Sequence, residues 1–136
     1  MLNKSLPLTS TGDETRDFTY VLVLVQGLLK AVFYEEAIVK AFNLASGRET
    51  KIKEMIARVN HSTGNSKQIT QLPPRKWDTK KRLLASIELA GKLIDYNPII
   101  SFEDGLNENF KWFSNNWAKV QLSLDFPVGM SNAVRK

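Results

Sequence analysis

An apolar stretch over residues 18–33 constrains the fold of this chain more than any other sequence feature. It carries no charged residue from Phe18 to Leu29, and Lys30 then interrupts it. A membrane-spanning helix needs roughly 20 predominantly apolar residues, so this stretch is too short and too mixed to be one. Its first residues, 18–21, are aromatic or β-branched, which is typical of a short strand. The stretch therefore predicts a buried strand followed by a buried helix.

The remaining periodicity predicts about four helices and two or three short strands. The helices are expected over approximately residues 24–32, 50–61, 86–94 and 101–120. The strands are expected at residues 18–21, 41–44 and, from a weaker alternation, 67–72. In the first helix the helical period runs through Leu24, Leu28 and either Ala31 or Val32.

Capping residues predict several of the helix ends. The Thr50 hydroxyl can accept hydrogen bonds from the free amides at the start of the second helix, and Gly64 is placed to end that helix. Asn97-Pro98 ends the third helix. Residues 101–104 resemble a capping box that opens the last helix, with Asp104 in place of the usual Glu.

The last helix has the clearest amphipathic pattern in the chain. Its apolar residues recur at spacings of four, three, four and three, which keeps them on one helical face. These residues are Leu106, Phe110, Phe113, Trp117 and Val120. We therefore expect one long helix that packs through this face.

These elements indicate a mixed α/β, helix-rich fold. Strands this short do not make a good sheet of their own, so we expect them to be edges or extensions of a larger sheet. With 136 residues and no internal repeat or linker, the chain reads as one lobe over residues 1–124. Residues 125–136 show no period and are expected to form a loose tail.

Composition limits the partners without choosing one. The net charge of +5 and the pI of about 9.5 suit an anionic partner such as a nucleotide, a nucleic acid or an acidic protein. A solvated lysine-rich surface explains the same numbers. The absence of cysteine removes disulfides and thiolate chemistry, and it fits a reducing cytoplasm.

Three segments occur in the order and spacing of a known family. They are Gly12 to Val21 (GDETRDFTYV), Lys40 to Thr50 (KAFNLASGRET), and Pro74 to Asp78 (PRKWD) continuing through Tyr96-Asn97-Pro98 to Ser101–Leu106. Together they resemble the carboxy-terminal, substrate-side portion of NAD-dependent nucleotide-sugar epimerases and dehydratases. These are extended short-chain dehydrogenases/reductases, and the UDP-glucose 4-epimerase-like type is the nearest match.

The resemblance implies a set of substrate contacts. Family members contact the substrate diphosphate through two arginines, which correspond to Arg16 and Arg75. Phe18 lies beside the first arginine, and Asp78 is expected near the nucleotide ribose. A guanidinium suits this role because its planar fork of donors binds phosphate oxygens in two places.

Structural explanations compete with these site assignments. Arg16 and Asp17 could form a solvated surface pair, and Phe18 could be a core residue. Asp78 could instead cap the segment that follows it. The sequence leaves these alternatives open.

The family's catalytic machinery has no counterpart in this sequence. There is no glycine-rich turn for a dinucleotide, and no Tyr-x-x-x-Lys, since Tyr20, Tyr34 and Tyr96 are followed at that spacing by Leu24, Ile38 and Ile100. We assign no catalytic, cofactor-binding or metal-binding residue to this chain. The resemblance implies NAD for the complete enzyme only, with the dinucleotide-binding Rossmann half supplied elsewhere.

Two departures from the family pattern concern helix ends. Leu22 and Val23 stand where family members usually carry acidic residues that cap the first helix, a loss worth about 0.5–2 kcal/mol. Asp95 stands where the family often has a helix-ending glycine. These changes indicate either relaxed constraint or a new buried surface.

Several functions remain as hypotheses. The first is a fragment of a nucleotide-sugar epimerase/dehydratase that contacts a UDP- or dTDP-linked sugar, with a Rossmann half or a second copy as partner and no membrane role. The others are a non-catalytic binding or self-association module and a gene fragment without a selected role. We rank nucleic-acid binding by the basic residues of segment 75–82, with Trp77 stacking on a base, below these. The sugar and the base are left open.

Overall fold

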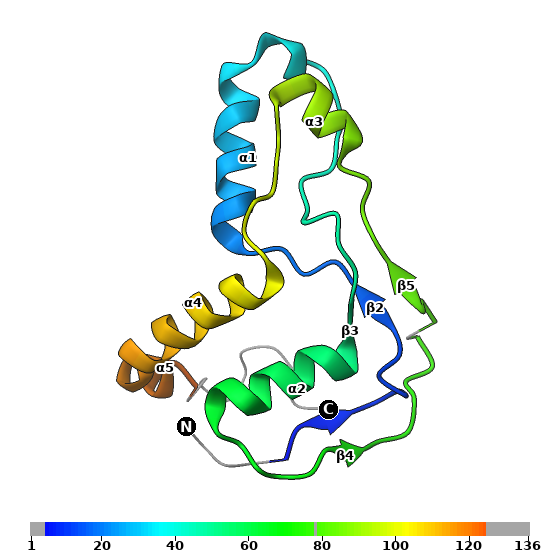
Figure 1. The fold of residues 1–136 in the computed structure, drawn as a ribbon, viewed down its shortest axis with the longest axis vertical. Helices are drawn as coiled ribbons and strands as arrows, with labels where there is room; N and C mark the ends of the chain where they lie inside the picture. Colours follow the sequence, from blue (N-terminus) through cyan, green and yellow to red (C-terminus); the bar gives the residue numbers. More distant parts are fainter. Residues whose placement is uncertain (1–4, 78, 125–136) are drawn as a thin grey trace.

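The computed structural model describes residues 5–77 and 79–124, and every element below lies within these ranges. Figure 1 shows an elongated arrangement with helices α1 (Val21–Phe33) and α3 (Glu88–Ile94) side by side at one end. Helices α2 (Ile52–Thr63) and α4 (Phe102–Asn115) lie towards the other end, and extended loops run between the two regions. Asp78 and the predicted tail, residues 125–136, fall outside the described residues.

The described residues form five α-helices and one short 3-10 helix. The α-helices are α1 (Val21–Phe33), α2 (Ile52–Thr63), α3 (Glu88–Ile94), α4 (Phe102–Asn115) and α5 (Trp117–Leu124). The 3-10 helix η1 spans Glu35–Ala37 and follows α1. The mixed, helix-rich α/β class is confirmed, with one α-helix more than the sequence predicts.

The strands are two residues long and form two small sheets. They are β1 (Pro7–Leu8), β2 (Thr15–Arg16), β3 (Thr50–Lys51), β4 (Thr70–Gln71) and β5 (Arg82–Leu83). Strand β1 pairs with β4 in parallel. Strand β2 lies between β3, which is antiparallel to it, and β5, which is parallel.

Two of the three predicted strands are wrong. Only the prediction at 67–72 is confirmed, since β4 lies inside it. Residues 18–20 lead into α1 instead, and residues 41–44 form no strand. A strand needs a hydrogen-bonded neighbour, and within the described chain neither segment has one.

Helix boundaries confirm some capping predictions and correct one. Gly64 ends α2 in the left-handed conformation, with φ of 63°. The Ser101 hydroxyl accepts a hydrogen bond from the Asp104 amide at 3.1 Å and so caps α4. The prediction for Thr50 is wrong, because Thr50 lies in β3 and Lys51 precedes α2 without a side-chain cap.

The predicted last helix is divided at Asn116. The Asn116 amide donates to the Trp112 carbonyl, and α5 begins at the next residue. The predicted apolar face is therefore bent: Phe113 is 42% exposed, whereas Leu106 and Phe110 are half-buried. A single long helix is the wrong description, since the periodicity alone does not reveal the break.

The main core lies between α1, η1 and α3. Its buried members are Val23, Ala37, Ala90, Ile94 and Tyr96. Helix α1 can approach the rest of this core closely because its inward-facing side chains are small, with Gly27 one turn after Val23. A Cβ on Gly27 would lie 2.8 Å from side-chain atoms of both Leu44 and Tyr96.

The start of α1 lacks the cap that the family usually has, as the sequence predicts. Tyr20 precedes the helix without a side-chain cap, and its first turn contains no acidic residue. Val23 is instead 2% exposed and belongs to the core. Asp95 adopts the left-handed conformation at the end of α3, with φ of 50°, and pairs with Lys30.

Among the helices described, none has the length and apolarity needed to cross a membrane.

Two helical glycines test this packing. Ala favours helices over Gly by about 1 kcal/mol, but Gly27→Ala should destabilise the protein by about 1–3 kcal/mol through overpacking. The Leu44 side chain can move, whereas the Tyr96 ring is held by the hydrogen bond from its hydroxyl to the Ala45 carbonyl, at 2.9 Å.

The matched control is Gly91→Ala on α3, where a Cβ would meet only the Tyr96 carbonyl oxygen, at 3.6 Å. This variant should be neutral or more stable by up to about 1 kcal/mol. Urea denaturation of the two variants measures the difference. Equal stabilisation by both alanines would show that α1 does not approach the core this closely.

Candidate functional site

Arg16 stands at the end of β2 and borders a hollow of about 550 Å³. Its side chain is half-buried, and Nη1 donates to the Thr15 carbonyl at 2.7 Å. The hollow is also lined by Asp17, Thr19, Asn43, residues 44–45 and residues 83–85. The structure thus places one predicted phosphate contact beside a cavity, with β3 and β5 flanking its strand.

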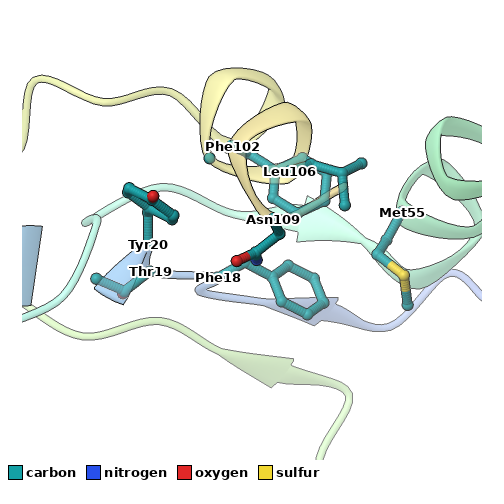
Figure 2. Close-up of a pocket in the computed structure, with 8 residues that line it drawn as sticks. Phe18, Thr19, Tyr20, Met55, Phe102, Leu106 and Asn109 are labelled. Carbon is teal, nitrogen blue, oxygen red and sulfur yellow. The ribbon is translucent and has the colours of Figure 1, made fainter. Parts of the chain in front are cut away.

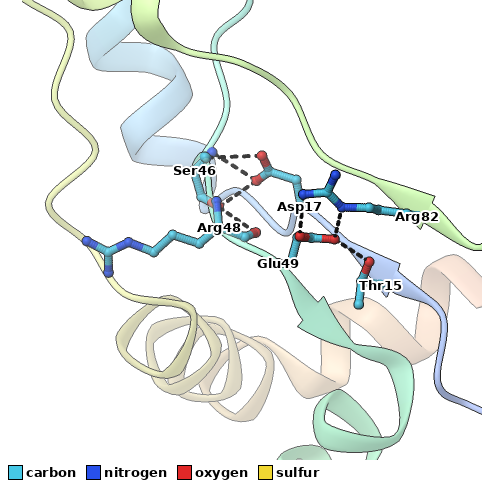
Figure 3. A network of polar contacts seen from close by, with 7 residues as sticks. Thr15, Asp17, Ser46, Arg48, Glu49 and Arg82 are labelled. Carbon is cyan, nitrogen blue, oxygen red and sulfur yellow. Dashed lines mark hydrogen bonds and ion pairs between the residues drawn. The ribbon is translucent and has the colours of Figure 1, made fainter.

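Asp17 holds the turn at residues 46–47, as Figure 3 shows. One carboxylate oxygen accepts from the Ser46 amide at 3.0 Å and from the Ser46 hydroxyl, and the other accepts from the Gly47 amide at 3.0 Å. The Thr19 hydroxyl oxygen also accepts a hydrogen bond from the same Ser46 amide, at 2.9 Å. The surface-pair explanation for Asp17 is therefore wrong, because its carboxylate clamps a turn 30 residues further along the chain.

Gly47 is required in this turn for two reasons. Its φ is +67°, a conformation that L side chains rarely adopt. A Cβ there would also lie 2.9 Å from the Ile87 side chain. The clamp thus fixes the segment that precedes β3 against both β2 and the start of α3.

A second polar network joins all three strands of the β3-β2-β5 sheet. Arg82 donates to Glu49 through two nitrogens, each at 2.8 Å, and the Thr15 hydroxyl donates to the same carboxylate at 2.6 Å (Figure 3). Hydrogen bonds from Arg82 and then Thr15 lower the pKa of Glu49 to about 2. Glu49 and Arg82 therefore tie β5 to the end of the 46–49 turn.

The pKa of Glu49 gives a direct test of this network. The folded-state pKa of Glu49 lies below the ordinary 4.5. The stabilisation of the fold by the Glu49–Arg82 pair should therefore be complete above about pH 4.5 and lost as the pH falls towards 2. A carbon-detected NMR titration should place the Glu49 midpoint near pH 2. In Arg82→Gln the midpoint should move back up towards 4.5. A Glu49 midpoint that is the same in both proteins would contradict the pairing.

Phe18 lines a different cavity from Arg16. Its ring packs against Phe102, with centroids 5.2 Å apart, at an apolar cleft of about 240 Å³ (Figure 2). Met55 of α2 and Leu106 of α4 also face this cleft, and the Asn109 amide points towards Phe18. These contacts favour the core interpretation of Phe18 over direct ligand contact.

Arg75 lies in the exposed segment between β4 and β5. Its guanidinium carbon is 6.0 Å from the centre of the Trp77 ring, a cation–π arrangement. Trp77 is 77% exposed, so it is not a core residue. The structure places Arg75 and Arg16 on separate segments, and Asp78 lies outside the described residues.

The sequence does not reveal the long-range contacts that shape the site. Asp17 lies within the Arg-Asp-aromatic motif, and Ser46 and Gly47 lie within the matched segment 40–50, but neither motif shows that these residues bond to one another. Glu49 and Arg82 are 33 residues apart, and one sequence does not reveal such a pair. Arg82 is also one of the basic residues of segment 75–82, so part of that charge is neutralised within the fold.

Comparisons with known proteins agree with this fold. The chain is 42% identical to an epimerase of Methanothermobacter thermautotrophicus, with a TM-score of 0.87 over 89% of this chain and 36% of that one. It is 30% identical to the Bordetella bronchiseptica enzyme WbmF in complex with NAD+ and UDP, with a TM-score of 0.72 over 88% and 35%. Among curated proteins, UDP-glucose 4-epimerase GEPI42 of Cyamopsis tetragonoloba is 31% identical over 79% of this chain and 31% of its own length. No family model matches the chain.

The fold and these relatives define the class. The homologues and structural neighbours of this chain are NAD-dependent epimerase/dehydratases of the extended short-chain dehydrogenase/reductase type. They are UDP-glucose 4-epimerase-like, which confirms the resemblance found in the sequence. The chain spans about a third of the length of the relatives that it matches. This share of their length is consistent with a carboxy-terminal portion of such a protein.

Proposed function

We propose that this chain supplies the diphosphate-contacting side of a nucleotide-sugar epimerase or dehydratase site and does not catalyse the reaction alone. The observation that carries the proposal is the position of Arg16, half-buried at the edge of a hollow and flanked by the Asp17 clamp. The fold match to an enzyme in complex with NAD+ and UDP supports it. A cytoplasmic setting is part of the proposal, since the chain has no cysteine.

Arg16 is suited to bind an anion because its backbone is fixed before any ligand arrives. Strand β2 is paired on both sides, and the next residue is tied to the 46–47 turn by three hydrogen bonds. A fixed backbone lowers the entropy lost on binding. The guanidinium can then offer two donors to one phosphate group.

Arg75 and Asp78 complete the proposed contacts from the segment that links β4 to β5. The exposed Arg75 supplies a second guanidinium for the diphosphate, and Trp77 lies against its charged group. Asp78 is proposed to accept from a ribose hydroxyl. Phe18 is proposed to lie beside this site without contacting the diphosphate. Its packing against Phe102 holds the segment that follows β2.

The NAD of the related enzymes does not fit the residues present in this chain. A dinucleotide pyrophosphate is usually held by a glycine-rich turn between a strand and a helix. The sequence contains no such turn, and Tyr20, which precedes α1, has no lysine four positions on. The proposed contribution of this chain is therefore to bind and orient the nucleotide diphosphate, which reduces the orientational freedom of the attached sugar.

Titration with UDP at low salt tests this function. UDP should shift the backbone amide signals of residues 15–19 and 43–46 in NMR spectra, whereas uridine should not, because the diphosphate carries the interaction. Arg16→Gln should weaken UDP binding about tenfold, the loss expected for one charge-assisted contact. Arg75→Gln should have a similar effect.

The matched control is Arg58→Gln, which removes the same charge from α2, where Arg58 pairs with Glu103. Its affinity for UDP should stay within about twofold of the unchanged chain, so that general loss of positive charge is excluded. Binding that is lost equally in all three variants, or equal binding of uridine and UDP, would show that no diphosphate site exists here.

A further inference from the structure

Trp77 is a large aromatic side chain that the fold leaves in solvent. It is 77% exposed, whereas tryptophan is highly buried on average in folded proteins. The Arg75 guanidinium lies over the ring, 6.0 Å from its centre, and most of the ring stays open. An exposed indole offers a flat π surface of the kind on which a nucleobase stacks.

The loop that carries Trp77, residues 72–81 between β4 and β5, is anchored at both ends. At its start the Leu72 amide donates to the Leu8 carbonyl at 2.8 Å. At its end the Lys81 carbonyl accepts from the Thr15 amide at 2.9 Å. Strands β1 and β2 therefore set the position of the loop, which lowers the entropy lost when a ligand binds to it.

These anchors also join the loop to the strand of the proposed phosphate contact. Thr15, which binds the last residue of the loop, directly precedes Arg16 in β2. Pro73 and Pro74 stiffen the start of the loop, because the proline ring fixes φ at about −65°. Arg75 follows this stiff pair and is thus presented from a restricted backbone.

Arg75 and Trp77 together suit a ligand that joins an anion to a flat ring. A guanidinium binds phosphate oxygens, and an indole stacks on the π face of a base. A nucleoside diphosphate carries both groups on one ribose, and Asp78, the proposed ribose contact, follows Trp77 directly in the sequence. We infer that Trp77 is the stacking surface for the base of the nucleotide. This inference deepens the proposed function and rests on it.

A single-stranded nucleic acid explains the loop less well. Proteins that bind such strands stack successive bases on several aromatic side chains, and Trp77 is the only aromatic residue among residues 72–81. Arg82, the basic residue that follows the loop, is already paired with Glu49. One ring beside one guanidinium fits a single nucleotide.

Binding of UDP and of inorganic pyrophosphate to the full chain tests the inference, because pyrophosphate lacks the base. Trp77→Leu should weaken UDP binding about tenfold and leave pyrophosphate binding within about twofold. Trp77→Phe keeps a ring, so its affinity for UDP should stay within about threefold of the unchanged chain. Trp112→Leu, at a 56% exposed position of α4, is the matched control and should bind both ligands normally.

Fluorescence and NMR report on the ring and on the loop separately. UDP should quench part of the tryptophan emission, and this quenching should disappear in Trp77→Phe, which keeps Trp112 and Trp117. The Thr15 amide signal should stay in place in Trp77→Leu, because its bond to the end of the loop does not involve the ring.

Failure of the stacking role can be told apart from failure of the proposed function. If both ligands bind but Trp77→Leu leaves UDP binding unchanged, or weakens both ligands alike, Trp77 does not stack on the base and the diphosphate site stands. If neither ligand binds, the proposed function is wrong and the stacking role with it. A thymidine oligonucleotide that binds more tightly than UDP, and loses this binding in Trp77→Leu, would show that the ring binds a nucleic acid instead.

Discussion

The hydrogen bonds of the Asp17 carboxylate to the turn at residues 46–47 hold together segments that are far apart in the sequence. The carboxylate accepts from two backbone amides and one hydroxyl of residues 46–47, and hydrogen bonds to an ionised group are roughly twice as strong as neutral ones. The clamp brings the strand that carries Arg16 against a turn that is distant in sequence. Burial, and then the negative charge of Asp17, raise the pKa of Tyr96, whose hydroxyl binds the Ala45 carbonyl within the same region.

The clamp also connects the two ends of the molecule. On one side lies the core of α1, η1 and α3, and on the other lie the β2 sheet and α2, which packs against α4. The Glu49–Arg82 pair extends the connection to β5 and so fixes one wall of the hollow beside Arg16. Fold and candidate site therefore share the same few polar contacts, which explains how a chain with so small a core can hold the segments around Arg16 in place.

Features set by nearby residues could be predicted from the sequence, and features set by distant partners could not. Gly64 and Ser101 act within one helical turn, so their capping roles follow from residue type and position. The strand expected at 41–44 fails because a strand depends on a neighbour that the described chain does not provide. The break at Asn116 leaves the apolar period intact, so the sequence pattern does not predict it. The family motif is enough to single out Arg16 as a candidate site residue. The hydrogen bonds that fix the neighbouring Asp17 are visible only in the structure.

We propose that Arg16, held by the Asp17 clamp, contacts the diphosphate of a nucleotide sugar. A crystal structure of the full chain with UDP bound would show this contact. We expect the diphosphate to lie in the hollow beside Arg16, within about 3 Å of its guanidinium nitrogens, while Asp17 keeps its bonds to Ser46 and Gly47. A diphosphate bound elsewhere, with Arg16 turned away from it, would show that Arg16 is not a phosphate contact.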